Sequence, residues 1–466
     1  MKTSLDFLLN GERVSLAGEN ASRTLLTWLR EARGLVGTKE GCAEGDCGAC
    51  TVVLAQLNSK GKLEYLPVNA CILSIGALEG KEVITVDGLK ALNGGALHPV
   101  QQAMVDCHGS QCGFCTPGFV MALYAHHKSN GSLERDALCD AIAGNLCRCT
   151  GYRPILEAGS RARALSRPER ESAEDAARAK RIAALPKETT RIKGFFSPLT
   201  VAELASFLVE HSQATLLAGG TDAGLMITKQ HRDLDEVAYV GRIAELKVLH
   251  ETKEHLEIGA AVTYAEAFGA LAGIHPDIGE LLRRFGAVQV RAAGTLAGNV
   301  ANGSPIGDSM PVLLALGASL ELQKGNKKRT VSLDDFYTGY RKTVLEPAEF
   351  IRSIRVPRLR PGERFAVYKL TKRLDQDISA VCAAFHVASG KARFAFGGMA
   401  ATPARAKKAE AGYARGIEAA CAALTEDFKP LSDQRASAWY RITAAQNLLR
   451  KFDAKVGPRA LLEVTP

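Results

Sequence analysis

The sequence lacks a long apolar run. A helix that crosses a bilayer needs about 18 or more consecutive apolar residues, and no such run occurs in the 466 residues. The first residues carry Asp6 and Glu12 without a long apolar core, so they do not resemble a secretory signal peptide. We therefore expect a cytoplasmic protein without a membrane-spanning segment.

Cysteine is nearly absent from most of the chain. Ten of the twelve cysteines lie between Cys42 and Cys149, and only Cys382 and Cys421 lie beyond. A disulfide scaffold is expected in short secreted chains. In a long chain without a signal peptide, this clustering indicates metal binding or catalysis.

Basic charge is not spread along the sequence either. The net charge is +9, from 59 basic and 50 acidic residues, and much of the excess lies in Arg161–Arg191. A nucleic-acid binder needs such charge gathered on one face with aromatic neighbours, so we expect no nucleic-acid partner. This stretch contains Pro168 and Pro186 and is interpreted as a partly helical, solvated linker.

The length suggests several domains, and the patterns change along the chain. Residues 1–90 combine strands with one helix near Thr24–Arg33, and Asn10-Gly11 predicts a hairpin turn. Residues 91–165 are helical: Thr116-Pro117 predicts a helix start that runs to Lys128, and Ser132 predicts the next cap. Both regions are small enough to form separate domains.

The second half of the chain has mixed character. We assign residues 166–191 to the linker, 192–361 to a glycine-rich α/β region and 362–466 to strands followed by alanine-rich helices. Strands are predicted at 365–368 and 381–386. The sequence therefore predicts a multidomain α+β protein.

The first cysteine constellation is Cys42, Cys47, Cys50 and Cys71. Three thiolates lie in one ten-residue loop, with the spacing of plant-type ferredoxins, and the fourth follows later. The loop contains Gly41, Gly45 and Gly48, which we expect to adopt positive φ angles and to direct N–H groups at the sulfurs. Zinc sites usually take ligands in two short pairs, so a 2Fe–2S cluster is favoured.

The second constellation is Cys112, Cys115, Cys147 and Cys149. Each pair is expected near a helix end, and two pairs can close one four-coordinate site. Alone this pattern also fits zinc, but its place after the first motif favours a second 2Fe–2S cluster. The remaining cysteines are expected to be buried, inert thiols: Cys107, Cys139, Cys382 and Cys421.

Two glycine-rich turns are candidates for binding a pyrophosphate through backbone N–H groups. They are Gly219-Gly220-Thr221-Asp222, after an apolar run, and Gly294–Asn299. Taken alone, they fit ordinary tight turns equally well. No G-x-G-x-x-G follows a strand, so no Rossmann dinucleotide site is expected.

These motifs together resemble the xanthine oxidase family of molybdenum hydroxylases. The resemblance rests on Glu40–Cys50, Gln111–Gly118, Gly144–Tyr152, Leu217–Asp222 and Thr295–Asn299, and covers nearly the whole chain. It implies a plant-ferredoxin-like β-grasp domain, an all-α four-helix 2Fe–2S domain, an FAD-binding α+β domain of the vanillyl-alcohol-oxidase type and a C-terminal α+β domain. The order of the domains is similar to the small subunit of bacterial members.

The resemblance also implies an FAD site and its residues. Leu217–Gly224 and Thr295–Asn299 would line the phosphates and ribityl chain, although Ala297 stands where a glycine is common. Phe285 and Ile351 would flank the isoalloxazine, and Asp308 and Lys369 would be polar contacts. The implied flavin contacts are Leu217, Ala218, Gly219, Gly220, Thr221, Asp222, Ala223, Gly224, Phe285, Thr295, Leu296, Ala297, Gly298, Asn299, Asp308, Ile351 and Lys369.

The implied activity is oxidation of hypoxanthine or xanthine to urate by a molybdopterin-binding large subunit, two copies of each subunit forming a heterotetramer. Gln111 would contact the pterin of the partner's molybdenum cofactor. Electrons would pass through both clusters to FAD, and flavin N5 would reduce NAD. Candidate residues on the NAD side are Tyr340, Arg341, Arg373 and Asp375.

Three alternatives remain. The chain could serve an aldehyde or N-heterocycle hydroxylase, because the substrate pocket lies in the partner. It could be a stand-alone iron–sulfur flavin reductase, or a non-enzymatic binding module held together by zinc.

Overall fold

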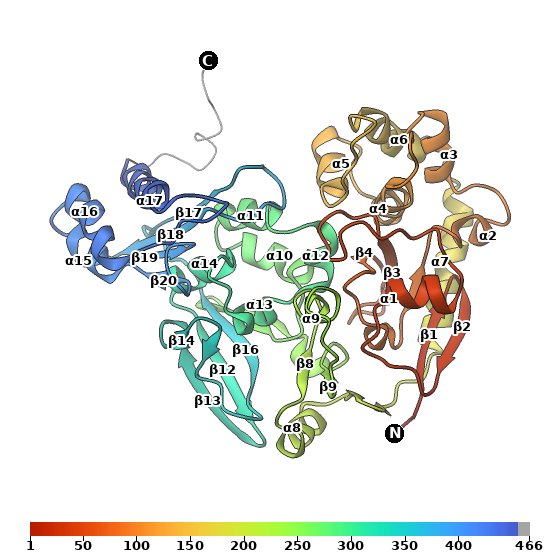
Figure 1. Cartoon of the computed structure of the whole chain (residues 1–466), viewed down its shortest axis with the longest axis horizontal. Helices are drawn as coiled ribbons and strands as arrows, with labels where there is room; N and C mark the ends of the chain where they lie inside the picture. Colours follow the sequence, from red (N-terminus) through yellow and green to blue (C-terminus); the bar gives the residue numbers. More distant parts are fainter. Residues whose placement is uncertain (455–466) are drawn as a thin grey trace. The chain divides into compact units, whose positions relative to one another are not determined.

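The computed structural model describes residues 1–454, which form two compact units (Figure 1). Unit 1 comprises Met1–Thr200, Ala214–Ile243 and Gly286–Gly294. Unit 2 comprises Val201–Gln213, Ala244–Phe285 and the chain from Thr295 onward. Each unit contains sheets and helices, so the protein has the multidomain α+β fold expected.

Unit 1 begins with a five-stranded sheet in the order β2-β1-β5-β3-β4. Its strands are β1 (Leu5–Leu9), β2 (Glu12–Leu16), β3 (Thr51–Leu57), β4 (Leu63–Asn69) and β5 (Glu82–Ile84). The predicted hairpin turn is confirmed, with Asn10 at φ 50° and Gly11 at φ 88°. The short helix α1 (Leu25–Thr27) and a π-helical turn, Trp28–Ala32, cover the sheet and bury Trp28 against Phe7.

Five helices follow, and Figure 1 shows them gathered together. They are α2 (Leu89–Leu92), α3 (Pro99–Asp106), α4 (Thr116–Lys128), α5 (Arg135–Ile142) and α6 (Arg153–Ala164). Helix α4 has the predicted extent, but Cys115 occupies its N-cap position and Thr116 is already helical. Ser132 accepts from Glu134 N–H one turn before α5 instead of capping it.

The stretch interpreted as a solvated linker contains the helix α7 (Pro168–Ala183), and one face of it is buried. Arg178 is 2% exposed and pairs with the buried Glu82 at 3.0 Å. Its guanidinium also donates to Tyr65 Oη at 2.7 Å. The prediction of a solvated segment is therefore wrong for this face, because a hydrogen-bonded guanidinium can be buried where an unpaired one cannot.

Unit 1 is completed by a four-stranded sheet in the order β6-β7-β9-β8. Its members are β6 (Thr190–Ile192), β7 (Phe195–Ser197), β8 (Thr215–Leu217) and β9 (Val237–Tyr239). Strand β9 runs parallel to both β7 and β8. The short helices α9 (Ala223–Thr228) and α12 (Val288–Ala293) also belong to this unit.

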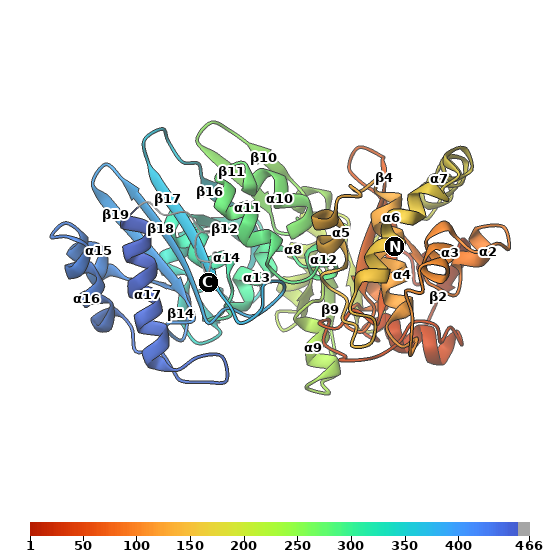
Figure 2. The ribbon, with the colours of Figure 1, turned by 90° about the horizontal axis from the view of Figure 1, so that it is seen from above.

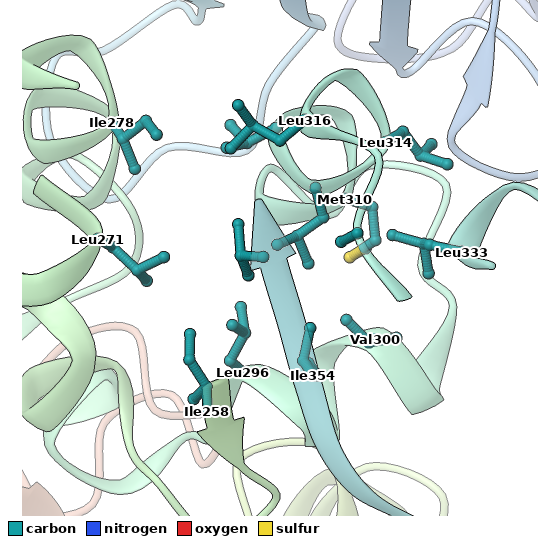
Figure 3. Close-up of a cluster of buried hydrophobic side chains, with 14 of the residues drawn as sticks. Ile258, Leu271, Ile278, Leu296, Val300, Met310, Leu314, Leu316, Leu333 and Ile354 are labelled. Carbon is teal, nitrogen blue, oxygen red and sulfur yellow. The ribbon is translucent and has the colours of Figure 1, made fainter. Parts of the chain in front are cut away.

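Unit 2 contains a five-stranded antiparallel sheet in the order β10-β11-β16-β12-β13. The strands are Leu249–Glu251, His255–Gly259, Phe350–Pro357, Ser319–Lys324 and Lys327–Ser332 in that spatial order. Its helices are α8 (Val201–Glu210), α10 (Tyr264–Ala272), α11 (Pro276–Arg283), α13 (Leu296–Asn302) and α14 (Ser309–Leu316). Figure 3 shows the core that the sheet shares with α10, α11, α13 and α14, where Leu271, Leu296, Met310 and Ile354 converge.

A second sheet of unit 2 has the order β17-β18-β19-β20, over Arg364–Leu370, Val381–Ala388, Lys391–Gly397 and Ala404–Arg405. Helices α15 (Lys407–Tyr413), α16 (Ile417–Asp427) and α17 (Ala438–Asp453) follow, and α17 lies along this sheet (Figure 2). Both strands predicted here are confirmed. Residues 455–466 of the predicted last domain lie outside the described residues. Within residues 1–454, none of the helices has the length and apolarity that crossing a membrane requires.

Helix α7 is held by a second buried group of charged side chains. His127 Nε2 lies 3.1 Å from Glu171 Oε2, and Lys128 Nζ lies 4.0 Å from the same oxygen. The hydrogen bond from His127 lowers the pKa of Glu171 to about 2. His98, whose ring packs against that of His127, caps α3, and burial lowers its pKa to about 3.

These lowered pKa values predict how stability depends on pH. A histidine whose folded pKa is depressed stabilises the protein above its unfolded pKa of about 6.5 and loses that contribution as the pH falls. The depressed pKa of Glu171 likewise stabilises the protein above about pH 4.5, and this contribution is lost as the pH falls further. We expect stability to decrease from pH 7 to 5 by up to about 1.4 kcal/mol per pH unit from His98 alone.

The substitution His98→Asn tests this expectation. Asparagine keeps an N-cap acceptor but does not titrate, so urea unfolding at pH 7, 6 and 5 should show a flatter dependence. The exposed His250 provides the control His250→Asn. An unchanged slope in His98→Asn would show that His98 does not titrate in this way.

Candidate iron–sulfur and flavin sites

The first four cysteines converge at one end of the ferredoxin-like sheet. Cys42, Cys47 and Cys50 lie in the loop before β3, and Cys71 follows β4. The sulfurs of Cys50 and Cys71 are 3.2 Å apart, and hydrogen bonds from the Cys47 and Cys71 thiols lower the pKa of Cys42. The contacts Cys42–Cys47, Cys42–Cys71 and Cys50–Cys71 thus bring together four sulfurs, the number of thiolates that a 2Fe–2S cluster requires.

The backbone of this loop donates hydrogen bonds to a cysteine sulfur, and two of its glycines have positive φ angles. Cys42 Sγ accepts backbone N–H groups from Asp46 at 3.4 Å and Cys47 at 3.3 Å. Gly45 and Gly48 have φ angles of 79° and 71°. Gly41 does not have a positive φ, contrary to the prediction; it is needed because a Cβ there would lie 2.7 Å from Cys47 Sγ.

The second four cysteines meet between helix ends. Cys112 and Cys115 precede α4, while Cys147 and Cys149 lie between α5 and α6. The Cys115 thiol contacts Cys147, and Cys112 contacts Cys149. Thr150 N and Oγ1 lie 3.5 and 3.2 Å from Cys147 Sγ.

The two sites differ in exposure. Cys50 and Cys71 are buried, whereas Cys112 and Cys149 are exposed. Gln111, predicted to contact a partner's cofactor, is exposed beside Cys112. The second site therefore opens to solvent on this chain, and the first is largely enclosed.

The other four cysteines lie apart from these sets. Cys382 and Cys421 are buried as expected, and burial raises the pKa of both thiols. Cys107, at the C-cap of α3, and Cys139, within α5, are only half-buried and pack against the core, so the expectation of buried thiols is wrong for these two. Burial also raises the pKa of Cys107.

The first glycine loop, 217–224, joins β8 to α9 in unit 1 and is packed backbone against backbone. A Cβ on Gly219 would lie 1.8 Å from Ala293 O, and one on Gly224 would lie 2.3 Å from Ile72 O. Gly220 has φ 74°. Ile72 follows Cys71 directly, so this loop lies next to a ligand loop of the first site. A backbone cradle without side chains suits a pyrophosphate.

The second loop, Thr295–Asn299, belongs to unit 2. Thr295 Oγ1 accepts from Gly298 N–H at 3.0 Å and caps α13. Leu296 and Ala297 are 1% and 4% exposed and pack into the core, so their side chains face away from any ligand and only their backbone groups can contribute. The Ala297 methyl group is accommodated there.

Asp308 and Lys369, predicted as separate polar contacts, are brought together as a buried ion pair. Ser379 Oγ donates to Asp308 Oδ1 at 2.6 Å. Ile351 is 6% exposed in β16, and the Phe285 ring lies 4.5 Å from that of Tyr264. All these residues belong to unit 2.

The candidates for the NAD side lie on exposed loops of unit 2. Arg373 pairs with Asp377 at 3.1 Å, and Asp375 lies 3.7 Å from Arg283. Tyr340 is 59% exposed, with the Arg341 guanidinium 5.7 Å from its ring centroid.

Several contacts at these sites could not be predicted from the sequence. Lys229, after α9, donates to Cys42 O at 2.7 Å and pairs with Glu44 at 3.3 Å. Leu146 N–H donates to Cys47 O at 3.0 Å, which links the two cysteine loops. Asn145 and Gln289 form a buried amide pair beside them. The sequence predicted the segments that carry the cysteines and glycines, but not these contacts between them.

Models of four domain families match the chain in order. They are the 2Fe-2S iron-sulfur cluster binding domain (residues 7–74), the [2Fe-2S] binding domain (85–160), the FAD binding domain in molybdopterin dehydrogenase (189–359) and the CO dehydrogenase flavoprotein C-terminal domain (366–456). The chain belongs to the xanthine oxidase family. Within that family it contains two 2Fe–2S-binding domains and an FAD-binding domain.

Relatives include the xanthine dehydrogenase of Emericella nidulans, 34% identical over 88% of this chain. Xanthine dehydrogenase/oxidase of Mus musculus is 33% identical over 83%. The chain spans 35% and 33% of the length of these relatives.

Solved structures are similar to part of the chain. The Cu,Mo-CO dehydrogenase in its cyanide-inactivated form shares 28% identity with a TM-score of 0.51, over 55% of this chain and 94% of that one. Quinoline 2-oxidoreductase from Pseudomonas putida 86 shares 22% identity with a TM-score of 0.51, over 56% of this chain and 95% of that one, and so supports the fold alone.

Serine substitutions test the two cysteine sets. Cys50→Ser should lower the iron content from four to about two atoms per chain, and Cys147→Ser should remove the other pair, because a 2Fe–2S cluster needs all four ligands. Metal analysis and the visible spectrum measure the loss. The control Cys139→Ser should keep all four irons; if it also lost two, the ligand assignment would be wrong.

The first glycine loop can be tested by adding a methyl group. Gly219→Ala places a Cβ against Ala293 O, so the loop must move and FAD content should fall well below one per chain while iron stays near four. Gly269→Ala is the control, since a Cβ there meets nothing within 4 Å and helical alanine is favoured. Full FAD content in Gly219→Ala would argue against this loop as the cradle.

Proposed function

We propose that this chain is the electron-transfer subunit of a xanthine dehydrogenase. Electrons from a molybdopterin-binding partner, which oxidises hypoxanthine or xanthine to urate, would pass through two 2Fe–2S clusters to FAD and then to NAD. The observation that carries the proposal is that both cysteine sets and the first glycine loop lie together in unit 1, joined by backbone contacts.

Each set of four cysteines would hold one cluster. The first cluster would be held by Cys42, Cys47, Cys50 and Cys71, and the second by Cys112, Cys115, Cys147 and Cys149. When bound, the flavin supplies the exchange between one-electron carriers and a two-electron acceptor. The chain binds, orients and shields these groups.

The partner would cover the exposed end of the second site. Gln111, Cys112 and Cys149 are exposed there, and the neighbouring Phe114 and Leu146 are 49% and 41% exposed. Exposed apolar side chains beside a redox site favour an interface with another protein that excludes water. We propose a heterotetramer of two small and two large subunits, with the molybdenum cofactor in the large one and Gln111 facing its pterin.

The NAD side would be formed by the exposed loops of unit 2. Arg373 and Asp375 each make an ion pair, and Tyr340 and Arg341 offer a ring and a cation. The same subunit could serve a molybdenum hydroxylase for another substrate. The likeness to CO dehydrogenase structures at 28% identity supports that alternative.

The first experiment is to purify the chain with whatever accompanies it and to quantify iron, zinc, flavin and molybdenum. We expect four irons and one FAD per chain, a molybdenum-bearing partner and xanthine-driven NAD reduction. A colourless zinc protein without flavin would contradict the proposal. A monomer with full NADH oxidation activity would indicate a stand-alone reductase.

The variant Gln111→Ala separates these possibilities further. Loss of one hydrogen bond to the partner's cofactor should slow substrate-driven reduction by roughly three- to tenfold and leave NADH-driven reduction of the flavin unchanged. The exposed Gln230 supplies the control Gln230→Ala. Equal rates in both variants would remove Gln111 from the electron path.

A further inference from the structure

A buried amide network connects three segments of unit 1 that are far apart in sequence. Gln289 on α12 donates through Nε2 to Asn145 Oδ1 at 2.9 Å and to Thr51 Oγ1 at 3.1 Å. Asn145 Nδ2 donates to Gly48 O at 2.9 Å and approaches Thr51 Oγ1 at 3.3 Å. The exposed fractions of Gln289, Asn145 and Thr51 are 1%, 2% and 1%.

Two of the three segments that this network connects are the cysteine loops. Gly48 and Thr51 flank Cys50 of the first site, and Asn145 lies two residues before Cys147 of the second. The loops touch directly, since a Cβ on Gly48 would lie 2.2 Å from Gly144 O. Asn145 therefore holds one cysteine loop against the other.

The third segment is helix α12, which packs against the first glycine loop. Helix α12 ends at Ala293, whose carbonyl oxygen lies against Gly219 of the first glycine loop, and Gly294 lies beside Thr221. Gln289 is one turn earlier on the same helix. Its side chain thus ties the helix that supports the glycine loop to both cysteine loops.

The geometry of the network fixes the orientation of each amide. Thr51 Oγ1 donates to Gly48 O at 2.6 Å and so is free to accept the N–H groups of Gln289 and Asn145. Gln289 Oε1 has no hydrogen-bond donor among the described residues and lies against Gly144, where a Cβ would be 1.9 Å away. Exchanging the positions of the nitrogen and oxygen of the Gln289 amide would place Oε1 against two acceptors, Asn145 Oδ1 and Thr51 Oγ1. One orientation of the amide is therefore favoured.

A buried amide with an unpaired oxygen is unfavourable for stability, and Gln289 is buried in spite of this cost while it donates to Asn145 Oδ1 and Thr51 Oγ1. We propose that Gln289 is a positioning residue, which fixes the two cysteine loops and the first glycine loop relative to one another for electron transfer. The inference rests on the proposed function, because it assumes that the three loops hold redox groups.

The test uses the full complex and compares Gln289→Met with the exposed control Gln230→Met. Methionine has nearly the same volume but cannot donate. We expect Gln289→Met to keep four irons and one FAD, to show altered EPR spectra of both reduced clusters and to pass electrons to the flavin roughly tenfold more slowly in a single turnover. Native spectra and rates at full occupancy would overturn the proposal.

A second pair covers the case in which Gln289→Met does not assemble. Thr51→Val removes the shared hydroxyl and Thr51→Ser retains it, so altered EPR spectra in the first and native spectra in the second are expected. If Gln289→Met and Thr51→Val both lose their clusters while Thr51→Ser keeps them, the network serves cluster loading and the positioning role is wrong. Absence of iron or flavin in the unmodified protein would instead refute the proposed function, independently of Gln289.

Discussion

Backbone packed directly on backbone is the constraint on which the sites of unit 1 depend. Gly48 lies against Gly144 O, Gly118 against Gly48 O, Gly224 against Ile72 O and Gly219 against Ala293 O, each with no room for a Cβ. Such contacts set the distances between these loops, because a side chain between two loops would separate them further. Every glycine in this set therefore has a steric reason that is independent of its own φ angle.

The sequence predicted which cysteines lie together better than it predicted the residues that support them. Cysteine spacing is a local signal, since three ligands lie within ten residues, and the hairpin at Asn10-Gly11 follows from turn chemistry alone. The extent of α4 was predicted with Thr116-Pro117 as its start, although Cys115 occupies the N-cap position, and the strands at 365–368 and 381–386 were also predicted. In contrast, Gly41 was assigned a positive φ, whereas its role is to leave space for Cys47 Sγ. That role depends on how the loop folds back on itself.

The sequence interpretation of 161–191 was wrong because it could not account for contacts between residues far apart in the chain. The composition of 161–191 favours solvent, yet Arg178 is buried because Glu82, Tyr65 and Asp175 surround its guanidinium. Partners 96 and 113 positions away along the chain cannot be inferred from composition. The same holds for Gln289, whose partners Asn145 and Thr51 are 144 and 238 positions distant.

The ion pair of Asp308 and Lys369 changes what these two residues can offer a flavin. A lysine already paired with a buried carboxylate is nearly neutral as a unit, so it would present a hydrogen-bond donor and little net charge. Ser379 occupies the other carboxylate oxygen, which leaves Asp308 with limited freedom to turn. The pair is therefore suited to fixing the shape of a polar wall within unit 2.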